Sequence, residues 1–295
     1  MAKPVGSGGE FPNSAVFNKA GTKACVLNAG EINGVAFVNC FLCFLFPSHL
    51  ICRLSCFHVD QIQGLIPISH SVRYLNMPQT TPAFGVPGSA SQVVFSSDEQ
   101  KLIVLAKGDN VTEGFIAMWD INSDDSLAQT PTIMNIGNKV YPFSMTPIPG
   151  SNAFVSGDAA LGYDIFNLDS FQNKDVKLMT EYPVPGQKGI CWSVQSPLTG
   201  NYYMTDTFGG KVVEISISSD LEAKTVKVSI AMGLVGVGPY MFHSNIIRML
   251  TMCYLILMSS TRPRQSEFRS RFPINDNSRV LLQLPVLACR QLYFN

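Results

Sequence analysis

The sequence contains few residues that could carry out chemistry, and they lie far apart along the chain. Asp158 and Asp206 form the one evident pair of carboxyl groups that could share acid–base work, which needs titratable groups positioned at one site. Carboxylate and amide oxygens also suit a hard cation or a small polar ligand. Asn and Asp are equally common in tight turns, where they bond the nearby backbone, so both interpretations stay open. The candidate ligand-binding residues are Asn13, Asn28, Lys107, Asp158, Trp192 and Asp206.

A repeating pattern of short apolar runs predicts the elements that position these residues. Similar phrases begin near Ser14, Val93, Ser144 and Ser193, and each is followed by a turn, a second apolar run, another turn and a third run. Period-two alternation and a spacing of roughly 50 residues are typical of propeller blades. We predict an all-β fold, an incomplete β-propeller of about four blades over Phe11 to Ile230, with these phrases as the innermost strands. The candidate residues would then lie on the face of the propeller where loops lead into the first strand of each blade.

Two segments depart from the repeat. Residues 37–55 are rich in Phe, Leu and Cys and interrupt the first blade, and removing them restores its pattern. Residues 236–295 use Arg and no Lys as their basic residue, unlike the earlier chain. We interpret residues 1–235 as a partial propeller with residues 37–55 as an insert. Residues 236–295 are interpreted as a tail that is poorly ordered or forms a short helix. Both segments resemble read-through sequence, although a peripheral membrane anchor is a second interpretation of the tail.

Cysteines and histidines are the residues of this sequence that could bind a transition metal. Cys40, Cys43, Cys52 and Cys56 superficially resemble a zinc motif, but the second spacing is wrong and no His or acidic partner accompanies them. The four histidines, at 49, 58, 70 and 243, do not fall at predicted blade entrances. We therefore expect neither a metal nor a cofactor.

Cys25 and Cys56 face each other across a predicted hairpin once the insert is removed. Directly opposed β-carbons lie about 4.5 to 5.5 Å apart, which allows a disulfide, and a buried pair of free thiols is the alternative. A disulfide would indicate an oxidising compartment. The glycosylation sequon Asn110-Val111-Thr112 points the same way.

Charge and hydropathy exclude several partners. The net charge is zero and no cluster of one sign occurs in the first 235 residues, which is unlike a nucleic-acid-binding protein. The apolar part of the insert is broken by Pro47, His49 and Arg53, too early for a transmembrane helix. The first residues, Met1 to Gly9, contain no apolar core of a signal peptide.

Four stretches carry a family resemblance: Gly9–Ser14, Gly114–Asp120, Pro142–Gly150 and Cys191–Ser193. They resemble the secreted fungal propellers labelled 3-carboxymuconate cyclase-like, within the seven-bladed lactonase family that includes 6-phosphogluconolactonase. The resemblance covers residues 8 to about 235 without the insert. It implies the lactonase-type propeller fold and an extracellular location.

The resemblance also bears on catalysis. Catalytic members carry a Pro-Arg-His element at a blade entrance, whereas this chain has Pro142-Phe143-Ser144. Phenylalanine and serine supply neither the cation nor the acid–base group that lactone chemistry needs, so no catalytic residue is assigned. We expect a secreted propeller, non-catalytic or weakly catalytic, that binds a small polar molecule or a cell-wall or surface ligand. The alternatives are a divergent lactone hydrolase or muconate-lactonizing enzyme, and a truncated or mis-spliced product without activity.

Overall fold

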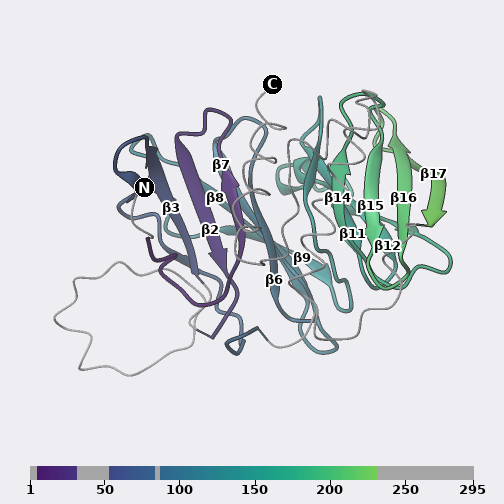
Figure 1. Cartoon of the computed structure of the whole chain (residues 1–295), viewed down its shortest axis with the longest axis horizontal. Coiled ribbons are helices and arrows are strands. Elements are labelled where there is room, and N and C mark those ends of the chain that lie inside the picture. Colours follow the sequence, from purple (N-terminus) through teal and green to yellow (C-terminus); the bar gives the residue numbers. More distant parts are fainter. Residues whose placement is uncertain (1–4, 32–52, 84–86, 231–295) are drawn as a thin grey trace, which may run out of the picture. The chain divides into compact units, whose positions relative to one another are not determined.

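The chain is built almost entirely of short antiparallel strands. The computed structural model describes residues 5–31, 53–83 and 87–230. Within these ranges the strands form four sheets, and the 3-10 turn η2 (Leu168–Phe171) follows β12 (Gly162–Asn167) (Figure 1). The predicted all-β class is confirmed.

Each sheet follows the chain in simple up-and-down order. The first sheet has one additional strand, β5 (Arg73–Tyr74), which pairs with β3 (Arg53–Asp60) and does not follow β4 in the strand order. The four sheets are β1 (Pro12–Phe17), β2 (Lys23–Asn28), β3 (Arg53–Asp60), β4 (Gly64–Pro67) and β5 (Arg73–Tyr74); β6 (Ala90–Phe95), β7 (Lys101–Ala106), β8 (Gly114–Asp120) and β9 (Thr132–Gly137); β10 (Thr146–Ile148), β11 (Ala153–Asp158), β12 (Gly162–Asn167) and β13 (Met179–Pro183); and β14 (Ile190–Gln195), β15 (Tyr202–Asp206), β16 (Lys211–Ile217) and β17 (Ala223–Ile230).

The chain divides into two compact units, residues 1–193 and 194–295, and the division falls within β14. The first three sheets lie in the first unit, and β15 to β17 lie in the second. No helix in the described ranges is both long enough and apolar enough to cross a membrane.

The tight turns between first and second strands follow from their sequence. Gly21, Gly150 and Gly200 have φ values of 66°, 77° and 74°, in the left-handed region that only glycine enters without strain. Asn18 closes the first of these turns, because its Oδ1 accepts the N–H groups of Thr22 and Lys23, each at 2.9 Å. The turn positions read from the sequence are thus formed as expected.

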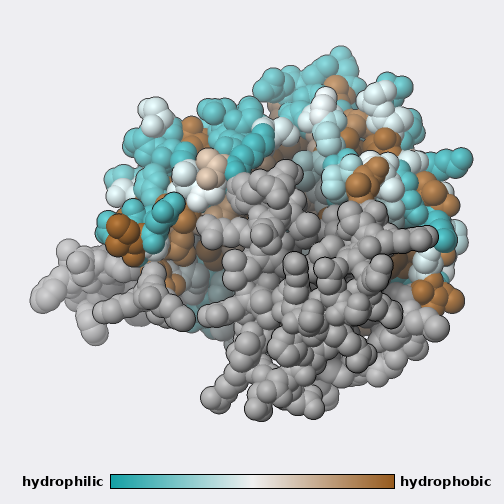
Figure 2. Space-filling model, turned by 45° about the horizontal axis from the view of Figure 1, so that its top comes forward, coloured by the Kyte–Doolittle hydropathy of each residue, from teal (hydrophilic) through white to brown (hydrophobic). Residues whose placement is uncertain are grey.

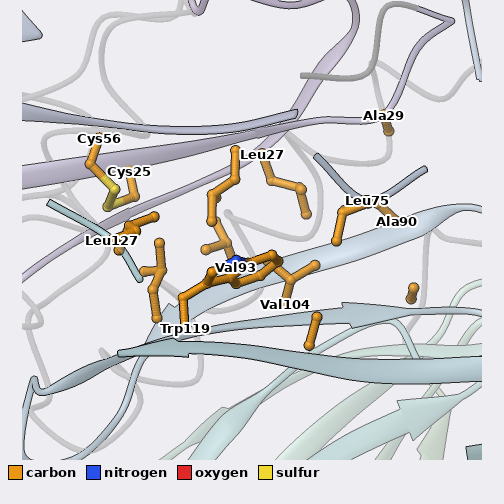
Figure 3. Packing of buried hydrophobic residues seen from close by; sticks show 14 of the residues in the cluster. Cys25, Leu27, Ala29, Cys56, Leu75, Ala90, Val93, Val104, Trp119 and Leu127 are labelled. Carbon is orange, nitrogen blue, oxygen red and sulfur yellow. A yellow bond between two sulfur atoms is a disulfide. The ribbon is translucent and has the colours of Figure 1, made fainter. Parts of the chain in front are cut away.

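The sheet β6–β9 has an apolar core on its first face, toward β1–β5. Alternate residues of β7 and β8 point to this side, as strand geometry requires, and Trp119 is fully buried there. Figure 3 shows Leu127 near the sulfur atoms of Cys25 and Cys56. The principal members of this first interface are Cys25, Leu27, Leu54, Cys56, Val93, Leu102, Val104, Ala117, Trp119 and Leu127.

The opposite face of β6–β9 packs against the sheet β10–β13. Phe154 and Phe166 stack with their ring centroids 5.0 Å apart, and they contact the other alternate residues of β7 and β8. The principal members of this second interface are Ile103, Leu105, Ile116, Met118, Ile136, Phe154, Phe166 and Leu168. Because both faces of β6–β9 are covered, β7 reads as a continuous apolar run rather than an alternating one.

Figure 2 shows hydrophilic residues over much of the described surface, with hydrophobic residues interspersed. The most exposed large hydrophobic residues, Ile62 at 90% and Val111 at 87%, come from different loops. Single exposed residues of this kind are normal on a folded protein.

Two details of the strand prediction need correction. Residues 53–55, assigned to the insert, belong to β3, where Val26 pairs with Ser55 and Leu27 with Leu54. Ser144 lies two residues before β10, because its hydroxyl accepts the Gly157 N–H at 3.1 Å in place of a backbone carbonyl. Residues 37–52 and 236–295 lie outside the described ranges, so their assignment remains a prediction.

Candidate functional site

Polar contacts link the first strands of successive sheets in the first unit. Asn13 Nδ2 donates to the Ala90 carbonyl at 2.8 Å, and the Val93 N–H donates to Ser14 Oγ at 3.2 Å. Farther along, Ser91 Oγ donates to the Pro142 carbonyl at 2.5 Å. These side chains lie where the sequence predicts the innermost strands, so the candidate residue Asn13 is anchored to the next blade.

Lys107, which directly follows β7, contacts the same end of β6 as Asn13 does. Its backbone N–H donates to the Ser89 carbonyl at 2.9 Å, which continues the ladder between β6 and β7 past the end of the strand. Its Nζ then lies 3.2 Å from Ser89 Oγ and 3.5 Å from the Ala90 carbonyl oxygen. Asn13 and Lys107, two of the six candidates, therefore meet at one carbonyl group.

The Lys107 amine also lies 4.4 Å from the centre of the Phe143 ring. We call Asn13, Ser89, Ala90, Lys107 and Phe143 the Asn13–Lys107 site. Lys107 is 4% exposed, and none of the ion pairs within the described ranges includes it. The site thus contains a buried amine with neutral neighbours.

Burial decides the charge of this amine. Loss of hydration lowers the pKa of Lys107 to about 7, and Cys191 opposes this shift. A ring under the ammonium contributes about 0.5 to 2 kcal/mol toward the charged form, whereas the effective penalty for burying an ion is several kcal/mol. Desolvation therefore dominates and favours the neutral amine.

The carboxylate of the candidate Asp158 accepts backbone hydrogen bonds beside this site. Its Oδ1 accepts the N–H groups of Tyr141 at 3.1 Å and Ala160 at 2.7 Å. Burial raises the pKa of Asp158, and these hydrogen bonds partly offset the increase. The carboxylate thereby holds the segment that leads to Phe143, as the turn-forming interpretation of Asp residues describes.

The other candidates lie in different surroundings. Asn28 is fully buried and exchanges hydrogen bonds with Ser7, accepting from its Oγ at 2.7 Å. Trp192 is half-buried in β14. Asp206 belongs to the second unit, where its Oδ1 accepts the Gly209 N–H at 3.0 Å. The structure brings Asn13 and Lys107 together and places Asn28 at a separate contact with Ser7.

Sequence reasoning missed Asp164, the most unusual carboxyl group in the first unit. It is fully buried in β12, and neither carboxylate oxygen has a hydrogen-bond partner. Burial, followed by the nearby Asp158 and Glu181, raises the pKa of Asp164 well above its ordinary value. An Asp between Tyr163 and Ile165 in an apolar strand was the available signal.

The Pro142-Phe143-Ser144 element is occupied by structural contacts. The Ser144 hydroxyl donates to the Cys191 carbonyl at 3.0 Å while accepting the Gly157 N–H. The Phe143 ring lies against Lys107. The Ser144 hydroxyl also lies 2.8 Å from Ser193 Oγ.

The histidines described by the structure lie elsewhere. His58 is half-exposed on β3, with Nε2 3.8 Å from Asp125 Oδ2, and His70 is in a turn with φ of 56°. His49 and His243 lie outside the described ranges. Across the described ranges, no group of three or more His, Cys, Asp or Glu residues is placed to hold a metal ion.

The remaining predicted features are a disulfide and a glycosylation site. Cys25 and Cys56 are opposed in the β2–β3 register and are joined by a disulfide. Asn110 is exposed in a loop closed by Asp109, whose Oδ1 accepts the Val111 and Thr112 N–H groups at 2.6 and 2.5 Å. Cys40, Cys43 and Cys52 lie outside the described ranges.

Comparisons with known proteins identify the fold. No protein-family model matches the sequence, and no curated protein matches it. Among solved structures, the periplasmic gluconolactonase of Pseudomonas aeruginosa is 14% identical over 78% of this chain and 59% of its own, with a TM-score of 0.52. A protein of Lactobacillus plantarum is 10% identical over 77% of this chain and 57% of its own, with a TM-score of 0.51.

These similarities agree with the strand order described above. The fold is a partial β-propeller like that of the gluconolactonase. The chain spans less than two thirds of the length of either solved structure.

Proposed function

We propose that this chain is part of a secreted, lactonase-type β-propeller that binds a small polar ligand at the Asn13–Lys107 site without turning it over. The observation that carries the proposal is the meeting of Asn13 Nδ2 and Lys107 Nζ at the Ala90 carbonyl. Asn13 Oδ1 is buried without a hydrogen-bond partner. A buried acceptor beside a buried amine suits a ligand that carries hydroxyl or carbonyl groups.

The absence of turnover follows from the side chains at the blade entrance. Lactone opening needs a base near neutral pKa and a cation for the developing oxyanion. The Ser144 hydroxyl contacts the Cys191 carbonyl, the Gly157 N–H and Ser193 Oγ, and Phe143 is apolar. Asp158 is held by two backbone N–H groups. We therefore assign the site to binding.

An extracellular location is part of the proposal. The Cys25–Cys56 disulfide suits an oxidising compartment, and the exposed Asn110 loop is accessible to glycosylation. Mass spectrometry of protein secreted from a eukaryotic host should find a glycan on Asn110 that Thr112→Ala removes. Secretion with Asn110 unmodified would contradict this part.

A lactone hydrolase is the second candidate function, and one observation favours it. The Lys107 amine lies over the ring of Phe143, the residue that stands where catalytic relatives would carry Arg. A positive charge from the neighbouring blade could stabilise an oxyanion there. The gluconolactonase of similar fold is named for lactone chemistry.

Binding and turnover can be measured on the same preparation. Calorimetry and ligand-observed NMR with gluconate and sorbitol should detect binding that Asn13→Ala and Lys107→Met each weaken at least tenfold. Lys101→Met is the matched control, because Lys101 lies at the opposite end of β7 from Lys107 and pairs with the exposed Asp120 of β8. No binding of either polyol would overturn the proposal.

A pH-stat assay with glucono-1,5-lactone separates the two functions. The binding proposal expects no release of acid above the uncatalysed rate. Turnover that Lys107→Met or Asp158→Ala abolishes would replace it by the hydrolase.

A further inference from the structure

We propose that Lys107 captures small aldehydes covalently, forming an imine through its Nζ atom. This inference rests on the ligand site proposed above and names the chemical class that the site takes. It begins from the placement of the amine between Ser89 Oγ and the Phe143 ring.

The surroundings of Lys107 favour a nucleophilic amine over an ion pair. Its contacts are a hydroxyl, a backbone carbonyl and an aromatic ring, and the nearby ionisable group is the buried thiol of Cys191 rather than a carboxylate. A lysine that is desolvated without a carboxylate loses the preference for the ammonium form. The pKa of about 7 agrees with this geometry. Lysines activated in this way attack carbonyl carbon atoms.

The reaction balances without a redox partner. The lone pair of Nζ forms a bond to the aldehyde carbon, and the carbonyl oxygen takes a proton from Nζ to give a carbinolamine. Loss of the hydroxyl group with the second Nζ proton gives a neutral imine and one water molecule. Ser89 Oγ, 3.2 Å from Nζ, is placed to pass the proton from nitrogen to oxygen.

Burial limits the size of the aldehyde. Because Lys107 is only 4% exposed, the smallest aldehydes, of two or three carbon atoms, are the most suitable probes of Nζ. Asn13 Oδ1, which has no hydrogen-bond partner, is an acceptor for a hydroxyl on such a molecule. The class is therefore a small hydroxyaldehyde, for which glycolaldehyde is the simplest probe.

Reductive trapping tests the proposal in the intact chain. The protein is incubated at pH 7 with glycolaldehyde and cyanoborohydride, which converts the imine to a stable secondary amine, and is then mapped by peptide mass spectrometry. We expect Lys107 to be labelled at least tenfold faster than the exposed Lys174 and Lys177, which serve as internal controls. Labelling no faster than at these lysines would overturn the proposal.

Two further measurements show whether the fold activates Lys107. In concentrated urea the three lysines should react at similar rates, whereas a preference that persists would reflect local sequence and contradict the proposal. Ser89→Ala should slow labelling of Lys107 severalfold and leave Lys174 unchanged. An unchanged rate at Lys107 would remove Ser89 from the reaction.

The outcome is distinguishable from failure of the proposed function. Sorbitol has no carbonyl group, so its binding tests the site without the reaction. Sorbitol binding without labelling of Lys107 would reject the aldehyde inference alone. Selective labelling without sorbitol or gluconate binding would reject the proposed polyol function and retain covalent capture.

Discussion

The sheet β6–β9 is buried on both faces, and the two faces differ in chemistry. The first interface combines aliphatic residues with Trp119 and the Cys25–Cys56 disulfide. The second interface contains stacked Phe154 and Phe166. By strand alternation, Lys107 continues the row of Leu105 and Asp164 continues the row of Phe166. The first interface therefore includes the disulfide and lies beside the buried guanidinium of Arg73, which donates to the Leu127 carbonyl, while the second lies beside Lys107 and Asp164.

Apolar and polar burial contribute differently to the stability of the two interfaces. Apolar burial stabilises in proportion to the area removed from water and needs no special geometry, so the first interface is suited to holding the blades together. Unpaired polar groups in the second interface oppose folding. Asp164 is such a group in the second interface, and Trp119 Nε1 is a buried donor without a partner in the first.

The largest expected effects come from removing a large side chain from either interface. Trp119→Ala and Phe166→Ala should each reduce the free energy of unfolding by about 3 to 5 kcal/mol, because both residues are fully buried. Denaturation in urea measures the loss. Ile62→Ala, at a residue 90% exposed, is the control and should change stability by less than about 0.5 kcal/mol. A small loss for Trp119→Ala would show that the first interface is not a packed core.

The disulfide should be the next largest contribution and belongs to the first interface alone. It closes a loop of 31 residues, for which the chain-entropy model gives about 3 to 4 kcal/mol. The double variant Cys25→Ala with Cys56→Ala should lose this amount in urea denaturation. Adding reductant should then destabilise the wild type but leave the double variant unchanged. Equal sensitivity of both proteins to reductant would contradict the pairing.

Asp164 should make stability fall as pH rises. Burial raises its pKa in the folded state, so its contribution is complete below the unfolded value of about 4 and is lost as pH increases through the folded value. Asp164→Asn removes the ionisation while keeping the shape. At pH 8 this variant should exceed the wild type by about 1 kcal/mol or more, and the difference should vanish at pH 4.

The matched control is Glu181→Gln, which alters an exposed carboxyl group opposite Asp164 in β13. Its effect on the pH dependence should be smaller than that of Asp164→Asn. A pH-independent difference between wild type and Asp164→Asn would show that Asp164 does not titrate over this range.

The smallest effects should come from the serines that link blades at the two interfaces. Ser144 is buried and bonds both Gly157 and Cys191, so Ser144→Ala should cost about 1 to 2 kcal/mol. Ser14 accepts one hydrogen bond, from the Val93 N–H, and is half-buried. Ser14→Ala should cost about 0.5 kcal/mol or a little more. If thermal denaturation showed a larger loss for Ser14→Ala than for Ser144→Ala, the number of hydrogen bonds would not determine the stability cost.

The strand pattern was predictable from sequence because local rules determine it. Turn glycines such as Gly150 and alternating apolar runs fixed the blades to within a few residues, and Cys25 was correctly set opposite Cys56 in the hairpin register. The predicted start of β3 lay three residues too late, because Arg53 and Ser55 were grouped with the apolar insert. Composition does not show where backbone pairing resumes.

The site was only partly predictable because its contacts join different blades. Lys107 and Asn13 were candidates from their positions, but Ser89 and Phe143 became partners only through the packing of β6, β7 and the segment before β10. Asp164 was overlooked, since its burial depends on the neighbouring sheet. Hydrogen bonds between distant segments leave no local signal in a single sequence.

The burial of β7 on both faces has a consequence before folding is complete. Its five apolar residues, Leu102 to Ala106, lie between Lys101 and Lys107. In an unfolded or newly synthesised chain both lysines are hydrated and charged, and such flanking charges act as gatekeepers against β-aggregation of an exposed apolar segment. Lys107 therefore protects solubility as an ammonium ion in the unfolded chain and becomes a largely desolvated amine once the blades close.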